Sequence, residues 1–225
     1  MTKLTHSFSS IKMYDNCPKR YYHQRIAKEV EDTGSVATIY GERVHSSIEK
    51  RIVNGDKLSE ETKEYESLCQ QILDSNARLD SSLHIEQKLC LDKNFNGTEW
   101  MSENAWFRSI LDVLVINKDK DIAVVMDWKT GKRRPDFMQL ELFAMQVFFH
   151  FRTVNKVISS FLWLKDMRTD SKVFTRENDL QNITSRFLRK LKSIDNSLAK
   201  NEWIPKPSGL CRFCPCKDFC KFAQK

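Results

Sequence analysis

An apolar run that ends in a carboxylate and a lysine is the feature that most constrains this chain. Ile122–Met126 is apolar, and Asp127, Trp128 and Lys129 follow it directly. In a β-strand, residues two apart share a face, so Asp127 and Lys129 project together while the Trp128 side chain points to the opposite face. The pattern predicts a buried strand that carries a polar site at its end.

A second aspartate, Asp112, interrupts an apolar segment over residues 109–116. The polar connection 117–121 is short enough to close an antiparallel hairpin, in which Asp112 lies nearly opposite Asp127. A carboxylate in so apolar a strand is costly unless it is paired or bound to a metal. Two facing carboxylates suit Mg2+ or Mn2+, and Lys129 would stabilise an attacking hydroxide or developing charge. The alternative is a structural salt bridge between Asp112 and Lys129.

Four of the seven cysteines fall within residues 211–220. No secretory signal opens the chain, so this density predicts a metal or cluster site in the cytoplasm or another reducing intracellular compartment rather than disulfides. A zinc ion and a 4Fe-4S cluster both fit, because each takes four thiolates in a tetrahedral array. Cys69 and Cys90 are expected to be ordinary buried thiols.

Together with other short motifs, these residues form a series of groups that follow one another along nearly the whole chain. They are Gly41-Glu42-Arg43-Val44-His45 with Glu49, Ile85-Glu86-Gln87-Lys88, Ser109-Ile110-Leu111-Asp112, Asp127-Trp128-Lys129-Thr130-Gly131, Gln139-Leu140-Glu141-Leu142-Phe143, and Cys17 with Cys211, Cys214 and Cys220. This order resembles the RecB-type branch of the PD-(D/E)XK nuclease superfamily, which includes the CRISPR adaptation nucleases with an iron-sulfur cluster. Ser109 stands where that branch usually has glycine, and Phe143 where it usually has tyrosine.

The resemblance implies a fold and a set of roles. The fold is α/β and restriction-endonuclease-like, a central mixed sheet flanked by helices in one nuclease domain, 1–225. Segments 1–30 and 200–225 would be joined by a 4Fe-4S cluster. The implied metal ligands are His45, Asp112, Asp127 and the Trp128 carbonyl. The implied catalytic residues are Glu86, Asp112, Asp127 and Lys129, and the implied substrate contact is Gln139. The implied cluster ligands are Cys17, Cys211, Cys214 and Cys220. A zinc site made of Cys211, Cys214, Cys216 and Cys220 remains the alternative.

Charge and aromatic content suggest a partner. The formal net charge of +7 suits a polyanion, and Lys132, Arg133 and Arg134 follow the Asp127 strand as a basic group that could bind phosphate. No apolar stretch is long enough to cross a bilayer. Six aromatic side chains would stack on unpaired bases if they were exposed, and would otherwise belong to the core: Tyr14, Tyr21, Tyr22, Trp100, Trp106 and Phe107.

The resemblance implies a metal-dependent DNA exonuclease that acts on single strands or DNA ends, alongside replication or recombination proteins. Two alternatives remain: a catalytically silent DNA-binding or recombination-complex subunit, and a zinc-stabilised interaction module. Hydrophobic periodicity gives the expected elements. Helices are expected over residues 10–27, from about 39 through His45, and over 60–76, 137–151 and 180–198; strands are expected over 83–91, 105–116, 122–128 and 156–164.

Overall fold

The computed structural model describes residues 4–31, 34–78, 81–117 and 121–223. The chain divides into two compact units, one made of residues 1–34 and 185–225 and the other of residues 35–184. The predicted α/β, restriction-endonuclease-like fold is confirmed in the second unit by a five-stranded mixed sheet flanked by helices. The assignment of the whole chain to one domain stays a prediction.

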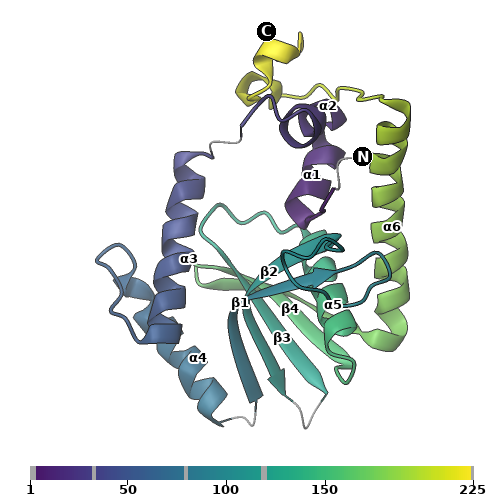
Figure 1. Cartoon of the computed structure of the whole chain (residues 1–225). Coiled ribbons are helices and arrows are strands. Elements are labelled where there is room, and N and C mark those ends of the chain that lie inside the picture. The colour runs from purple at the N-terminus through teal and green to yellow at the C-terminus, as the bar shows by residue number, and fades with distance from the viewer. Residues whose placement is uncertain (1–3, 32–33, 79–80, 118–120, 224–225) are drawn as a thin grey trace. The chain divides into compact units, whose positions relative to one another are not determined.

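The sheet of the second unit runs in sequence order (Figure 1). Its strands are β1 (Ser81–Leu91), β2 (Phe107–Asn117), β3 (Ile122–Lys129), β4 (Lys156–Trp163) and β5 (Arg168–Thr175). Only β3 and β4 pair in parallel, and the crossover that a parallel pair requires is the helix α5 (Phe137–His150). The sequence analysis missed β5, because this edge strand carries polar residues and only a short apolar pair, Val173 and Phe174.

The predicted hairpin between β2 and β3 is confirmed. Val113 pairs with Met126, so the next step of the same register sets Asp112 opposite Asp127. Part of its connection, residues 118–120, lies outside the described residues. The two aspartates therefore approach each other because the hairpin register is fixed by the buried apolar residues of both strands.

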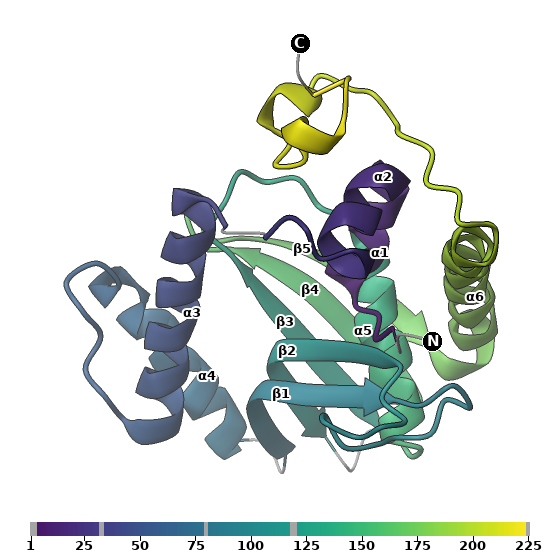
Figure 2. The same cartoon turned by 45° about the horizontal axis from the view of Figure 1, so that its top comes forward.

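Helices α3 (Val36–Asn54) and α4 (Glu66–Arg78) cover one face of the sheet (Figure 2). α3 begins three residues before the expected Ile39, because Ser35 caps it in a reciprocal capping box with Thr38. Val44, Ile48 and Ile52 recur at helical spacing and pack with α4 and the sheet in a buried cluster that includes Trp128. The predicted helix 60–76 becomes a 3-10 turn at 63–65 followed by α4.

Helix α5 covers the other face of the sheet (Figures 1 and 2). Asp136 accepts a hydrogen bond from the Met138 N–H at 3.2 Å and so caps its N-terminus. Its C-terminal end is held by Arg176, whose guanidinium donates to the carbonyl oxygens of Phe148, Phe151 and Val154 at 2.7–3.0 Å. These bonds satisfy carbonyl groups that a helix end leaves without partners.

The first unit begins with helices α1 (Phe8–Asn16) and α2 (Pro18–Tyr21) and a π-helical turn, Tyr22–Ile26. The single helix expected over 10–27 is wrong, because Pro18 lacks an N–H and disfavours helical geometry in the residue before it. Cys17 is accordingly extended, with φ −163° and ψ 106°. The break places the only N-terminal cysteine between two short helices.

Both chain ends take part in the first unit. Helix α6 (Arg176–Lys200) continues into it, and two 3-10 turns follow at Cys211–Phe213 and Lys217–Phe219. The Tyr14 hydroxyl donates to the Ser193 carbonyl oxygen at 2.8 Å, and the Tyr21 ring stacks on Trp203 with centroids 6.1 Å apart. Contacts between side chains separated by most of the sequence therefore hold the N- and C-terminal segments of this unit together.

The helix predicted over 180–198 lies within α6, which buries apolar residues at helical spacing. Ile183, Phe187, Leu191 and Ile194 are buried, whereas Leu198 near the helix end is 37% exposed. Among the helices in the described part of the chain, none has the length and apolar character needed to span a membrane.

Candidate metal centre and nuclease site

Three carboxylates line up across β1, β2 and β3. Ile85 pairs with Val113 and Gln87 with Leu111, so Glu86 stands beside Asp112, which in turn faces Asp127. Glu86 adopts φ 49°, a left-handed conformation that is uncommon outside glycine and interrupts the pairing at this position. Such strain tends to persist where surrounding structure enforces it at a functional position.

His45 reaches this row from α3. Its Nδ1 lies 3.4 Å from Asp112 Oδ1, and its Nε2 lies 3.1 Å from the Trp128 carbonyl oxygen. The Trp128 N–H donates to Asp112 Oδ2 at 2.6 Å. Three of the residues expected as metal ligands are thus brought together by one helix and two strands.

Asp127 is engaged on both carboxylate oxygens. Lys129 Nζ lies 2.6 Å from Oδ2 as an ion pair, and Gln139 Nε2 donates to Oδ1 at 3.0 Å. The ion pair of Lys129 is therefore with its strand neighbour Asp127, and the alternative of a structural salt bridge to Asp112 gains no support. Gln139, expected to touch substrate, fixes Asp127 from the start of α5.

The donor atoms of His45, Glu86 and Asp112 lie within 4.8 Å of one another. Two carboxylates and an imidazole are suitable ligands for a hard or borderline divalent cation. The sequence analysis gave Glu86 a catalytic role and no ligand role. Its left-handed backbone, which brings its carboxylate into this group, has no signal in the sequence.

The crowding of negative charge around these groups favours a bound cation. Burial and then the charge of Asp112 raise the pKa of Glu86 to about 7. The same two causes raise the pKa of Asp127 to about 7, although Lys129 opposes them. Burial lowers the pKa of His45, but the hydrogen bond and charge of Asp112, with the other carboxylates, raise it overall. Negative charge is therefore crowded enough that protons are retained, and a divalent cation would relieve that crowding.

The site opens into a pocket of about 650 Å³ between α3 and the end of β3. Glu49 lines this pocket near His45, although among the described contacts no hydrogen bond joins the two. Gly41 permits the approach of α3, because a Cβ at this position would lie 3.1 Å from Thr130 Oγ1. Glycine thus avoids a tight contact where the helix passes the loop after β3.

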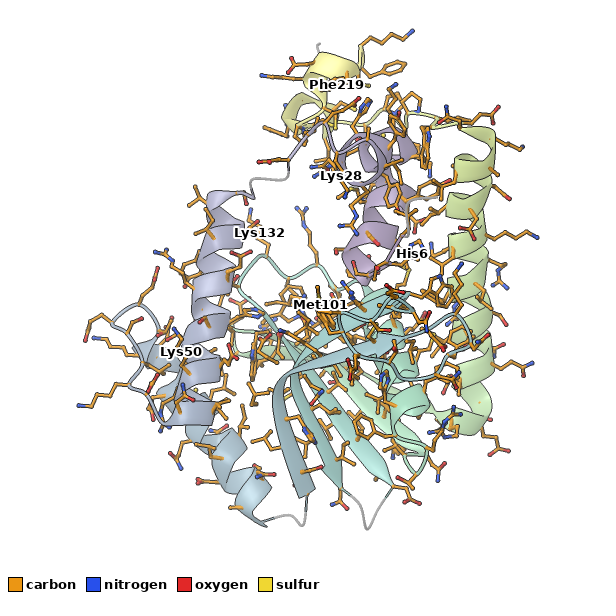
Figure 3. All side chains as sticks on the ribbon, viewed as in Figure 1. His6, Lys28, Lys50, Met101, Lys132 and Phe219 are labelled. Atoms are coloured by element: carbon orange, nitrogen blue, oxygen red, sulfur yellow. The ribbon has the colours of Figure 1, made fainter. Side chains whose placement is uncertain are left out.

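The basic residues after β3 divide into two kinds. Lys132 and Arg134 are exposed, and Figure 3 shows Lys132 on the connection between β3 and α5. Arg133 instead forms a bidentate ion pair with Asp170 of β5, and Trp163 Nε1 donates to the same carboxylate at 2.7 Å. Asp170 had no sequence signal, because β5 itself was not anticipated.

The cysteines of the first unit gather around a separate small pocket of about 80 Å³, lined among others by Cys17, Cys211, Cys214, Cys216 and Cys220. The Ser208 N–H donates to Cys211 Sγ at 3.2 Å. Burial and the neighbouring Cys214 raise the pKa of Cys216 to about 12. Cys69 and Cys90 lie in the other unit and are buried, as expected.

The aromatic residues considered for base stacking have mostly structural places. Tyr14, Tyr21 and Phe107 are buried, and Trp106 packs edge-on against Phe95 at 5.6 Å. Trp100 differs, because its ring lies beside two cationic side chains.

Comparison with known proteins identifies a family for the sequence and a similar fold among solved structures. The sequence model of the PD-(D/E)XK nuclease superfamily matches residues 5–221. No curated protein matches the sequence. Among solved structures, SSO0001 is similar over 99% of this chain and 89% of its own, with 15% identity and a TM-score of 0.51. A protein from Eubacterium rectale described as a "putative exonuclease" is similar over 98% of this chain and 87% of its own, with 14% identity and a TM-score of 0.50.

Proposed function

This chain belongs to the PD-(D/E)XK nuclease superfamily, and we propose that it hydrolyses phosphodiester bonds of DNA with a divalent metal ion. The observation that carries this proposal is the convergence of His45, Glu86 and Asp112, with donor atoms within 4.8 Å of one another, beside the Asp127–Lys129 ion pair. The ligand set is His45, Asp112, Asp127 and the Trp128 carbonyl, with Glu86 added by its position.

The metal, Mg2+ or Mn2+, would polarise the scissile phosphate and lower the pKa of a bound water. The protein's own groups do the rest. Lys129 is held next to the ligands by Asp127, where its ammonium group stabilises the hydroxide or the charge that develops on phosphate. Gln139 keeps Asp127 in place through its amide. Lys132 and Arg134 remain exposed to bind substrate phosphates, whereas Arg133 anchors the loop that carries them.

The finer assignment is an exonuclease acting on single-stranded DNA or DNA ends. The fold it shares with the Eubacterium rectale protein described as a "putative exonuclease" agrees with this assignment. Replication or recombination proteins are the expected partners, in the cytoplasm or another reducing compartment where thiols persist. The cysteine pocket would hold a structural 4Fe-4S cluster through Cys17, Cys211, Cys214 and Cys220. The support is that Cys17 lines one pocket with the C-terminal cysteines.

The test of the nuclease assignment uses end-labelled single-stranded and duplex DNA with Mg2+ or Mn2+. Wild type is expected to cut and Lys129→Ala to lose at least a hundredfold in rate, since one preorganised charge-stabilising group is worth this much. Lys57→Ala, an exposed lysine between α3 and α4, is the matched control and should cut as wild type. A terminal product ladder would identify an exonuclease. If wild type binds DNA but cuts neither substrate, the silent binding-subunit alternative replaces this proposal.

The cluster has its own test in anaerobically purified protein. Iron and sulfide should be present in wild type, lost in Cys17→Ala, and kept in Cys69→Ala, a buried thiol of the other unit. Zinc without sulfide, unaffected by Cys17→Ala, would instead identify the four-cysteine zinc site that includes Cys216.

A further inference from the structure

A cationic cluster of the second unit lies beyond Glu86 along β1 and is not used by the metal centre. Trp100, in the connection between β1 and β2, has Lys88 Nζ 5.9 Å and Arg108 Cζ 5.1 Å from its ring centroid. Lys88 comes from β1 and Arg108 from β2. One indole therefore gathers two positive side chains from neighbouring strands.

Within the described part of the chain, neither cation has an anionic partner. Among the residues that the structure describes, Lys88 and Arg108 form no ion pair with a carboxylate, and Arg108 Nε is buried without a hydrogen-bond acceptor. A cation over an indole gains only about 0.5–1 kcal/mol at exposed sites, which does not replace a hydrogen-bond acceptor for a buried N–H. Lys88 is exposed and Arg108 is half-buried, so their charged groups, rather than the buried Nε, are suited to an anion supplied from outside the chain.

The loop that presents Trp100 is firmly built. The Asp92 carboxylate accepts the N–H groups of Asn94 and Asn96 at 2.8 Å, and the Phe95 ring stacks on Phe149 of α5 at 4.7 Å. The Trp106 N–H donates to the Leu91 carbonyl oxygen at 2.9 Å where the loop returns to β2. Trp100 thus projects from an anchored loop, which keeps the two cations preorganised.

Position connects this cluster to the site. Lys88 is two residues beyond Glu86, and Arg108 is four residues before Asp112, which corresponds to about 7 Å and about 13 Å along a strand. Ile110, opposite Lys88, is 39% exposed, and Met101, next to Trp100, is 82% exposed. Figure 3 labels Met101 on this loop. Exposed apolar side chains beside unpaired cations offer contacts to bases as well as to phosphates.

We infer that Lys88 and Arg108, held by Trp100, bind the backbone of a single-stranded nucleic acid that leads to the metal centre, while Met101 and Ile110 contact its unstacked bases. The cations bind the phosphates, and the apolar side chains contact base faces, which are stacked in the interior of a duplex but accessible in a single strand. The inference rests on the proposed function for the destination of the strand, but it concerns binding and is tested without cleavage.

The experiment measures binding of fluorescein-labelled oligo(dT) by anisotropy across a salt series, in an Asp127→Asn background. Lys88→Gln and Arg108→Gln remove the charges and keep most of each stem. Each should weaken binding roughly three- to tenfold and reduce the slope of log affinity against log salt by about 0.7. Trp100→Ala should weaken binding to a similar degree, and Lys50→Gln, an exposed lysine on α3 labelled in Figure 3, should leave it within twofold.

A duplex of the same length separates single-strand binding from general charge attraction. The three variants should change duplex affinity less than twofold. Equal losses for duplex and oligo(dT), or losses no larger than that of Lys50→Gln, would overturn the inference. Unchanged melting temperatures of the glutamine variants exclude misfolding as the cause. If the wild type does not cut DNA but the variants show these binding losses, the nuclease proposal alone is refuted.

Discussion

Both ring nitrogens of His45 face oxygen atoms: Nε2 lies 3.1 Å from the Trp128 carbonyl oxygen and Nδ1 lies 3.4 Å from Asp112 Oδ1. Only a protonated imidazole donates from both nitrogens. The carboxylates around it raise the pKa of His45 accordingly. A metal ion that takes an imidazole nitrogen must therefore displace a proton.

Metal binding should release protons near neutral pH. Calorimetric titration with Mn2+ at pH 6.5, in buffers of different ionisation enthalpy, should show net proton release, because the raised pKa values of His45, Glu86 and Asp127 favour their protonated forms. His45→Gln should release fewer protons and bind Mn2+ about tenfold or more weakly. An enthalpy that is independent of the buffer would contradict the protonation assigned to this site.

The stability of the metal-free protein should fall as pH rises. Burial, followed by the charge of Asp112, raises the folded-state pKa of Glu86 and of Asp127 to about 7, above their unfolded values. For acids shifted upward, the folded state binds more protons, so their stabilising contribution is complete below about pH 4 and is lost through about pH 7. Melting temperatures in EDTA between pH 5 and pH 8 test this, and a fall should be smaller in Glu86→Gln.

Asp127→Asn should stabilise the metal-free protein while it abolishes cleavage. Burial and Asp112 together outweigh the attraction of Lys129, so removing this charge at pH 8 should gain roughly 1–3 kcal/mol, or several degrees in melting temperature. The amide retains a partner in Gln139. Thermal melts at pH 8 and pH 5 should show the gain only at the higher pH; a loss at both would mean that the ion pair dominates.

Gly41 and Thr130 should be energetically coupled. Alanine is favoured over glycine in a helix by about 1 kcal/mol, but a Cβ at Gly41 would lie 3.1 Å from Thr130 Oγ1. Gly41→Ala should therefore stabilise a Thr130→Ala protein and not the wild type. Urea unfolding of the four proteins of this cycle should give a coupling energy of about 0.5–1 kcal/mol. Additive effects would show that the loop yields freely.

The anchor of the loop after β3 should depend more on Asp170 than on Arg133. Asp170 accepts from both Arg133 and Trp163, so Asp170→Ala leaves an indole N–H without an acceptor, whereas Arg133→Ala leaves that bond intact. Asp170→Ala should lower the melting temperature more than Arg133→Ala. Both variants should raise KM for DNA, since each releases the segment that carries Lys132. Equal melting temperatures would contradict the role of Trp163.

The residues that the sequence predicted well share a physical reason. The hairpin of Asp112 and Asp127 follows from two apolar strands joined by a short polar connection, and its register can be counted. The pairing of Lys129 with Asp127 follows from the two-residue repeat of a strand. Local periodicity is enough for both, because the partners are close in sequence.

What the sequence did not predict depends on contacts made far along the chain or on backbone geometry. Nothing in the sequence indicates the left-handed conformation of Glu86, since a glutamate within a strand pattern predicts ordinary extended backbone. The edge strand β5 is mostly exposed and polar, so it lacks the nearly continuous apolar runs that mark β2 and β3. The break at Cys17 was readable from Pro18 and was missed because the apolar spacing continues across it. The assignment of the cluster ligands stays a prediction.

The division of the first unit between the two chain ends has a consequence for biosynthesis. Trp203, the stacking partner of Tyr21, is translated 182 residues after it. At roughly 5–20 residues per second, this delay lasts about ten to forty seconds. Residues 35–184 are complete before Trp203 is added, so the ribosome delivers a sheet unit that is ready to fold while the N-terminal helices still lack their partner. The contacts between the two segments of the first unit therefore form only after the sheet unit has been synthesised.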